Sequence, residues 1–139
     1  MGAIFRTAEA FGVERVLISP HTASPLHPRA SRSARGATGV LPWEVAPLEA
    51  LAGRGGIVAL ELRGRPLGEF PFPRRGVLLV GSEELGLSPE ALALADAGRV
   101  SIPMAGAKRS LNVAVAFGIV LQAWAAHLEA SRPDRPAAD

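Results

Sequence analysis

The sequence contains no cysteine and no tyrosine, and it has one lysine, one asparagine and one glutamine among 139 residues. The lack of cysteine excludes disulfides, thiolate zinc sites and cysteine nucleophiles. No apolar run approaches the roughly 20 residues that a membrane-spanning helix needs, so no membrane partner is predicted. No signal peptide is recognisable, because the first residues carry charge within a helical pattern. Few amides suit the protein of a thermophile, the alternative being the codon bias of a GC-rich genome. They direct attention to the single asparagine, Asn112.

Arginine supplies nearly all of the positive charge, and the formal net charge is only +2. A hydrophobic content of 48% with 20% charged residues is typical of a folded globule and excludes the disordered class. The length suits one domain, and neither an internal repeat nor a linker divides it. We therefore expect one domain over residues 1–131 and a flexible tail over 132–139.

Short apolar runs alternate with helical patterns along the chain. This alternation predicts an α/β fold with a mainly parallel sheet flanked by helices. The run Gly76–Val80 is apolar throughout, as expected of a strand covered on both faces. We expect Ser110 to cap the last helix and residues 63–75 to form a connection. The strands are predicted over 15–19, 56–62, 76–80 and 99–102, and the helices over 2–11, 29–36, 46–52, 89–95 and 110–129.

Two segments of the first two thirds contain residue types that suit a binding site. In residues 2–13, Arg6 stands in a mostly apolar helix, and the structural alternative is that its side chain simply lies along the surface. In residues 78–88, a buried strand runs into a turn where Gly81 and Gly86 allow close backbone approach and Glu83 can accept hydrogen bonds. Such turns are common, and this one matches neither the dinucleotide fingerprint nor the P-loop.

A third segment, residues 101–124, places a strand, a flexible loop and a helix start in succession. The N–H groups of a helix start, together with Ser110 and Asn112, can hold polar groups of a ligand. The structural alternative is an ordinary capped helix after a loop.

In order, spacing and residue types, these segments resemble the three motifs of the SpoU-type RNA 2′-O-ribose methyltransferases of the SPOUT class. The resemblance covers essentially the whole chain. The matching residues are Gly2, Arg6, Phe11 and Gly12 in the first motif, Gly81, Glu83 and Gly86 in the second, and Ile102, Pro103, Met104, Ser110, Leu111 and Asn112 in the third.

The resemblance implies a C-terminal trefoil knot, which chain topology alone would not suggest because knots are so rare. It also implies that S-adenosylmethionine binds in this knot and leaves as S-adenosylhomocysteine, without a metal. The residue types are consistent with such a cofactor site, because apolar strand ends and a glycine turn can enclose an adenine ring. The three histidines, His21, His27 and His127, show no metal-ligand spacing. The implied cofactor contacts are Leu60, Gly81, Ile102, Met104, Ser110 and Leu111.

The implied reaction transfers a methyl group to a ribose 2′-hydroxyl of tRNA or rRNA, with Arg6, Glu83 and Asn112 as catalytic residues. A guanidinium stays protonated and is a poor base, so we expect Arg6 to anchor phosphate and polarise the hydroxyl. We expect Glu83 and Asn112 to position the site and Ser110 to support the loop.

The implied partners are RNA in the cytoplasm and a second copy of the chain. Arg29, Arg32 and Arg35 recur every three residues and would form one ridge on a helix. Four more arginines flank a loop: Arg63, Arg65, Arg74 and Arg75. As a set they favour phosphate contacts, the alternative for each being a solvated surface. The helix over 111–128 is apolar around more of its circumference than one core face requires, which fits a homodimer interface.

The chain departs from the family pattern at its start. The first motif of the family begins with an asparagine two positions before the glycine that matches Gly2, and an inner strand of the sheet precedes it. We therefore expect that the start lies inside a longer reading frame, which the upstream genomic sequence would decide. Two alternatives to the enzyme are a non-catalytic RNA-binding relative and an unrelated nucleotide-binding α/β protein, and titration with S-adenosylmethionine separates the first of them.

Overall fold

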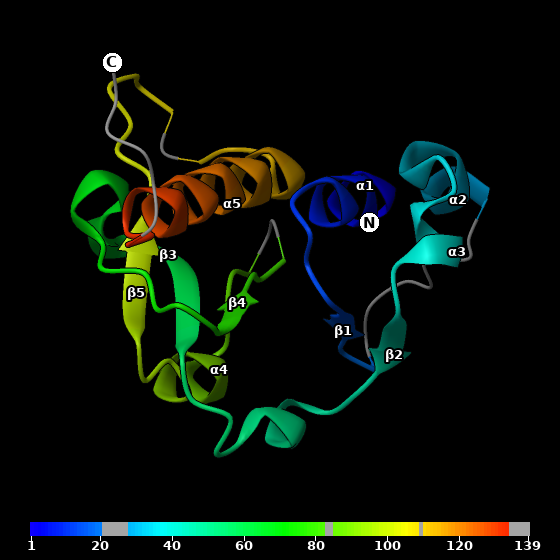
Figure 1. The fold of residues 1–139 in the computed structure, drawn as a ribbon, viewed down its shortest axis with the longest axis horizontal. Coiled ribbons are helices and arrows are strands. Elements are labelled where there is room, and N and C mark those ends of the chain that lie inside the picture. Colours follow the sequence, from blue (N-terminus) through cyan, green and yellow to red (C-terminus); the bar gives the residue numbers. More distant parts are fainter. Residues whose placement is uncertain (21–27, 83–84, 109, 134–139) are drawn as a thin grey trace.

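A computed structural model describes residues 1–20, 28–82, 85–108 and 110–133 of the chain (Figure 1). Helices and short parallel strands alternate along it, as the sequence predicts. The helices are α1 (Gly2–Ala10), α2 (Pro28–Ala34), α3 (Ala37–Val40), α4 (Pro89–Ala93) and α5 (Val113–Ala130), with two 3-10 turns, η1 (Leu48–Leu51) and η2 (Leu67–Glu69). The strands are β1 (Val16–Ile18), β2 (Trp43–Val45), β3 (Ile57–Pro66), β4 (Val77–Leu79) and β5 (Gly98–Ser101).

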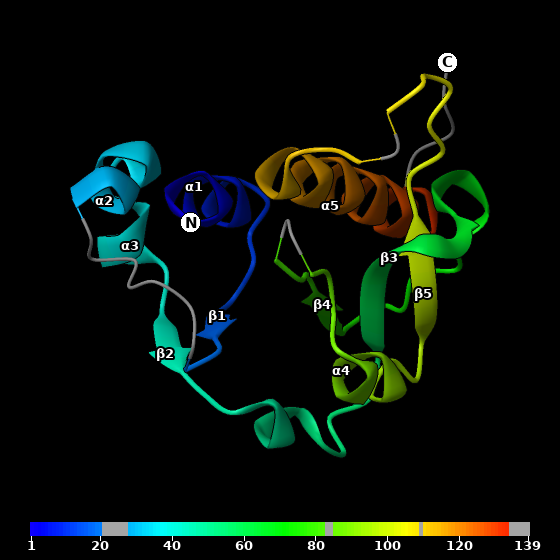
Figure 2. The same ribbon diagram turned by 180° about the vertical axis from the view of Figure 1, so that it is seen from behind.

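The described strands form two parallel sheets, one of order β1-β2 and one of order β4-β3-β5. The prediction of an α/β fold with parallel strands is confirmed, whereas the single sheet is replaced by these two. Figures 1 and 2 show α1 and α5 lying side by side over the two sheets. Strand β2 was not predicted, because its three residues, Trp-Glu-Val, are too few to show a periodic pattern.

Strand β3 contains a bulge beside β5. Leu60 and Arg65 both pair with Val100, so residues 61–64 are inserted in β3 between these two pairs. The Ser101 hydroxyl donates to the Gly64 carbonyl at 2.8 Å, and a Cβ on Gly64 would lie 2.7 Å from the Arg99 carbonyl carbon. The prediction that residues 63–75 form only a connection is therefore wrong up to Pro66, because pairing with β5 overrides the poor strand propensity of this charged, glycine-containing stretch.

Two helix predictions are corrected. The helix expected over 46–52 is the single 3-10 turn η1, which begins after Pro47. Helix α5 begins at Val113, and its N-cap is Asn112 and not Ser110. The Asn112 Oδ1 accepts hydrogen bonds from the N–H groups of Ala114 at 2.9 Å and Val115 at 3.3 Å. Asparagine is as strong an N-cap as serine, so the sequence alone left two competing cap positions.

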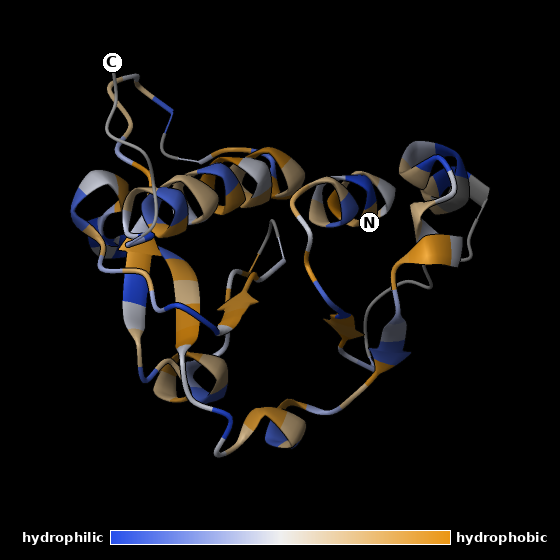
Figure 3. Cartoon of the chain, in the orientation of Figure 1, coloured by the Kyte–Doolittle hydropathy of each residue, from blue (hydrophilic) through white to orange (hydrophobic). Residues whose placement is uncertain are grey.

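Helix α5 joins two parts of the core. Phe117 and Leu121 pack with Phe5 of α1, while Val120 and Trp124 pack against the three-stranded sheet. Figure 3 shows the apolar residues of the strands that these helices cover. By length and composition α5 is apolar enough to cross a membrane, contrary to the expectation that no apolar run is long enough, and 22% of it is buried inside the structure. Its core contacts account for only part of its apolar character, since Val115 and Ile119 are exposed.

Candidate functional site

The carboxyl ends of β4 and β5 meet at one edge of the three-stranded sheet, beside the point in β3 where the first pairing with β5 ends at Leu60. Leu60 of β3 pairs with Val100 of β5, Ile102 follows β5 directly, and Gly81 lies two residues beyond β4. Leu60 and Ile102 are half-buried and pack on the same core cluster. The structure therefore brings three of the predicted cofactor residues to the edge where parallel α/β sheets bind their ligands.

The turn after β4 is closed by two glycines. A Cβ on Gly81 would lie 2.2 Å from the carbonyl carbon of Gly86, and Gly86 has a φ of +65°. The Gly86 N–H donates to the Ser82 carbonyl at 2.9 Å, and the Leu85 N–H donates to the Ser82 hydroxyl at 3.0 Å. The turn therefore requires glycine at both positions. Glu83, a predicted catalytic residue in this turn, lies outside the described residues.

The loop between β5 and α5 contains the remaining predicted cofactor residues. Met104 is half-buried, whereas Ser110 and Leu111 are exposed. Because α5 starts at Val113, the N–H groups of Ser110 and Leu111 belong to the loop and not to the helix start that we expected to present them. The N–H groups of the first turn at positions 114 and 115 are bound instead by Asn112.

Arg6 lies on the exposed side of α1, opposite the buried Phe5 and Ala8. Within the described part of the chain its guanidinium forms no ion pair. Helix α1 packs beside the first half of α5, where the Thr7 methyl group lies 3.6 Å from the position of a Cβ on Gly118. The helix of the first motif thus lies beside the helix that follows the third motif, and Arg6 is exposed on it.

The arginine ridge predicted over residues 29–36 is only partly formed. Arg29 and Arg32 lie exposed on α2. Arg35 is not on this helix, because α2 ends at Ala34 and Arg35 adopts a left-handed φ of +50°. Sequence spacing did not reveal this end, since an arginine seldom adopts a left-handed conformation.

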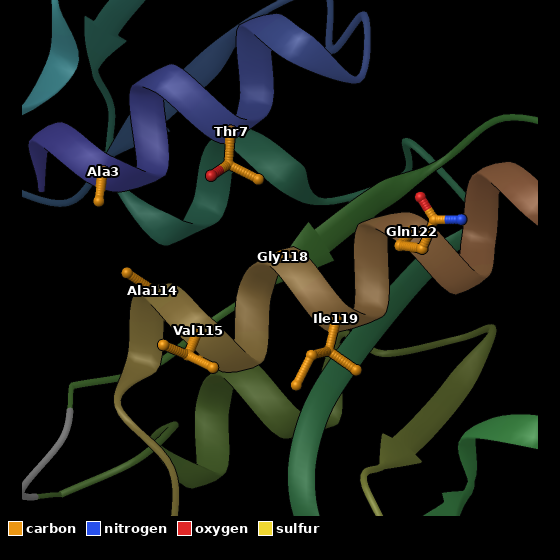
Figure 4. A pocket seen from close by; sticks show the side chains of 7 residues that line it. All are labelled: Ala3, Thr7, Ala114, Val115, Gly118, Ile119 and Gln122. Carbon is orange, nitrogen blue, oxygen red and sulfur yellow. The ribbon is translucent and has the colours of Figure 1, made fainter.

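A groove of about 530 Å³ runs between α1 and α5 (Figure 4). Val115 and Ile119 are 52% and 36% exposed along it, so the extra apolar face predicted for the last helix is present. The small residues of the groove were not predicted from the sequence, although their spacing of four along each helix indicates a shared face. The lining residues are Ala3, Thr7, Ala114, Val115, Gly118, Ile119 and Gln122.

Among the described residues, no three His, Asp or Glu side chains form a group that could hold a metal. His127 lies edge-on to Phe72, with ring centroids 5.8 Å apart. His21 and His27 lie outside the described residues. The described part of the candidate site offers glycine backbone and half-buried apolar side chains, and Arg6 lies exposed on α1.

The chain matches the SpoU rRNA Methylase family over residues 1–122. An uncharacterized tRNA/rRNA methyltransferase of Synechocystis is 35% identical over 138 residues, covering 91% of this chain and 50% of that protein. The tRNA (guanosine(18)-2′-O)-methyltransferase of Thermus thermophilus is 43% identical over 82 residues, covering 58% of this chain and 42% of that protein. The chain thus spans half or less of the length of these relatives.

Among solved structures, the fold is similar to that of the SpoU methyltransferase AviRb from Streptomyces viridochromogenes in complex with AdoMet. The TM-score is 0.79 at 32% identity, over 90% of this chain and 51% of that one. A second structure, an AdoMet-bound rRNA methyltransferase from Sinorhizobium meliloti, gives a TM-score of 0.82 at 32% identity, over 91% and 51% of the two chains.

Proposed function

The chain belongs to the SpoU rRNA methylase family, and from that premise we propose that it transfers a methyl group from S-adenosylmethionine to a ribose 2′-hydroxyl of tRNA or rRNA. Relatives named as tRNA/rRNA methyltransferases, and two similar structures bound to AdoMet, support the reaction class and the cofactor. The 2′-O position is supported by the name of the Thermus relative. We further propose that the C-terminal segment forms a trefoil knot and that the protein acts in the cytoplasm.

The observation that carries the proposal is the closed glycine turn after β4, at the same edge of the sheet as two half-buried apolar side chains of the neighbouring strand β3 and of the residue after β5. Leu60 and Ile102 offer half-buried apolar surface to an adenine ring, and Met104 adds a third such side chain. Gly81 presents backbone without a side chain in the way. These residues fit the cofactor, which when bound supplies an electrophilic methyl group on a sulfonium.

Arg6 is the residue we assign to the RNA. Its side chain is exposed and keeps its charge, so it can hold a phosphate and stabilise negative charge as it develops on the 2′-oxygen. A guanidinium gives up no proton at neutral pH, so the hydroxyl proton leaves to phosphate or to water. Arg6 therefore acts as an anchor and an electrostatic group, and not as a general base.

Asn112 is better described as a positioning residue. Its Oδ1 accepts from two N–H groups of the first turn of α5, which fixes where the helix begins. The loop carrying Ser110 and Leu111 ends at this cap, so the cap also fixes where these two residues approach the cofactor. We keep Glu83 as a proposed positioning residue in the glycine turn.

We propose that the protein is a homodimer that pairs through α1 and α5. The groove between these helices is lined mostly by apolar and small side chains. Two exposed β-branched side chains, Val115 and Ile119, stand along it. A second copy would remove this apolar surface from water.

Two measurements test the proposed function. Calorimetric titration with S-adenosylmethionine is expected to show binding, and incubation with unmodified RNA and isotopically labelled cofactor is expected to yield 2′-O-methylated nucleosides by mass spectrometry. Label on a base instead of a ribose would contradict the 2′-O assignment. RNA binding without any cofactor heat would instead identify a non-catalytic RNA-binding relative.

A further inference from the structure

A second cleft, of about 430 Å³, lies at the opposite end of the three-stranded sheet. It is found where β3 and β4 begin, whereas the glycine turn lies where β4 ends. Its lining consists of two arginines and the starts of two strands. These residues are Arg54, Gly55, Arg75, Gly76 and Val77.

The two loops that carry the arginines are held together by glycines. A Cβ on Gly76 would lie 2.1 Å from the Gly56 carbonyl oxygen, and one on Gly56 would lie 2.4 Å from the Arg75 carbonyl oxygen. The Val77 N–H donates to the Gly56 carbonyl at 3.0 Å. Any side chain at either glycine would separate the loops, so the backbone fixes Arg54 and Arg75 on two sides of one cleft.

The cleft carries positive charge from two arginines. Arg54 and Arg75 are exposed, and neither pairs with a carboxylate among the residues whose placement is described. The Arg54 Nε donates to the Ala50 carbonyl at 3.3 Å, which orients this side chain. Asp96 also lies beside the cleft, and its carboxylate accepts from the N–H groups of Ile57 at 2.7 Å and Gly56 at 3.2 Å. Its one formal negative charge leaves an excess of one positive charge from the two arginines.

We propose that this cleft binds a backbone phosphate of the RNA substrate, at a distance from the ribose that is methylated. This inference rests on the proposed function, which supplies RNA as the substrate. Two guanidinium forks match the tetrahedral oxygens of a phosphodiester and hold it with charge-assisted hydrogen bonds. Four residue steps separate Val77 from Gly81, roughly 13 Å along the strand, so one RNA molecule can occupy both places.

The test replaces both arginines by glutamine. The variant R54Q/R75Q is compared with R15Q/R132Q, which loses the same charge from arginines already paired with Glu44 and Glu129. Binding to a mixture of unmodified tRNA transcripts is measured by fluorescence anisotropy over a series of salt concentrations. We expect R54Q/R75Q to bind about tenfold or more weakly, and its log–log salt slope to fall by about 0.7–0.9 for each phosphate that the variant no longer neutralises.

Equal affinity and salt slope in R54Q/R75Q and in the control would overturn the inference. So would loss of inorganic phosphate binding without loss of RNA affinity, because the cleft would then be a site for free anions. Titration with S-adenosylmethionine separates the two proposals. Cofactor binding together with RNA binding that does not depend on the two arginines overturns this inference alone, whereas RNA binding that depends on the two arginines, without cofactor binding, overturns the proposed function alone.

Discussion

Arg6 is an exposed, permanently charged side chain on a helix whose other side is buried. Its chemistry limits it to binding anions and stabilising developing negative charge, and both act on the RNA and not on the methyl donor. We therefore expect Arg6→Ala to lower the rate of methyl transfer by at least about 100-fold and to leave the affinity for S-adenosylmethionine within about twofold.

The control for this variant is Arg15→Ala, an exposed arginine whose partner is Glu44 at 3.2 Å. Surface ion pairs contribute little, so this variant is expected to keep both activity and fold. Transfer rates come from labelled-cofactor assays and affinities from calorimetry. An Arg6→Ala protein that methylates RNA at the normal rate would remove Arg6 from the mechanism.

Asn112 offers a second test at the scale of one residue. Asn112→Ala removes the Oδ1 that accepts from Ala114 and Val115, and is expected to lower the free energy of unfolding by about 1 kcal/mol. Asn112→Asp keeps a capping oxygen and should restore that stability. Urea denaturation followed by circular dichroism measures both. Equal stability of the alanine and aspartate variants would mean that the cap does not hold the helix start.

The glycine turn after β4 is the element that we expect to bind the cofactor through its backbone. We expect Gly81→Ala to weaken binding of S-adenosylmethionine by about tenfold or more, because the added methyl group meets the Gly86 backbone at 2.2 Å and the turn must open. Gly39→Ala is the matched control, since nothing lies within 4 Å of its Cβ position. Calorimetry measures the affinity, and thermal melting shows whether the fold survives. Unchanged cofactor binding in a folded Gly81→Ala protein would place the cofactor elsewhere.

Among helices and strands, the sequence predicts well those whose residue patterns are local. The apolar run that contains β4 and the periodic pattern of α1 need no partner to be recognised. Strand β2 and the last residues of β3 owe their conformation to pairing with β1 and β5, which no local pattern reveals. The start of α5 was misplaced by three residues because Ser110 and Asn112 are both capable caps.

The candidate site was predicted unevenly for the same reason. Leu60, Gly81 and Ile102 were predicted to contact one cofactor, which stays a prediction, and the parallel order β4-β3-β5 places them toward one edge of the sheet. The cleft between Arg54 and Arg75 was not expected, since it forms only when two loops 20 residues apart pack through glycines. Contacts that depend on backbone touching backbone leave little trace in the pattern of side chains.

For the whole molecule, the groove between α1 and α5 determines the expected assembly. The buried side of α5 packs against two clusters of the core. Val115 and Ile119 are not part of that buried side, and their apolar side chains are exposed. We expect the protein to be a dimer at micromolar concentration and V115E/I119E to be monomeric. Two carboxylates without partners would have to be buried at the interface, which costs several kcal/mol.

Leu62→Glu is the control for this variant, because Leu62 is also an exposed apolar side chain, at 66%, but lies on β3 outside the groove. Sedimentation and light scattering give the masses, and thermal melting verifies that each variant folds. Helix α1 carries Arg6 and lines the same groove through Ala3 and Thr7, so pairing there would place the RNA anchor beside the partner copy. Monomeric V115E/I119E should therefore lose methyl transfer while Leu62→Glu keeps it. A monomeric unaltered protein would contradict the interface, and a monomeric variant with full activity would show that one copy suffices for transfer.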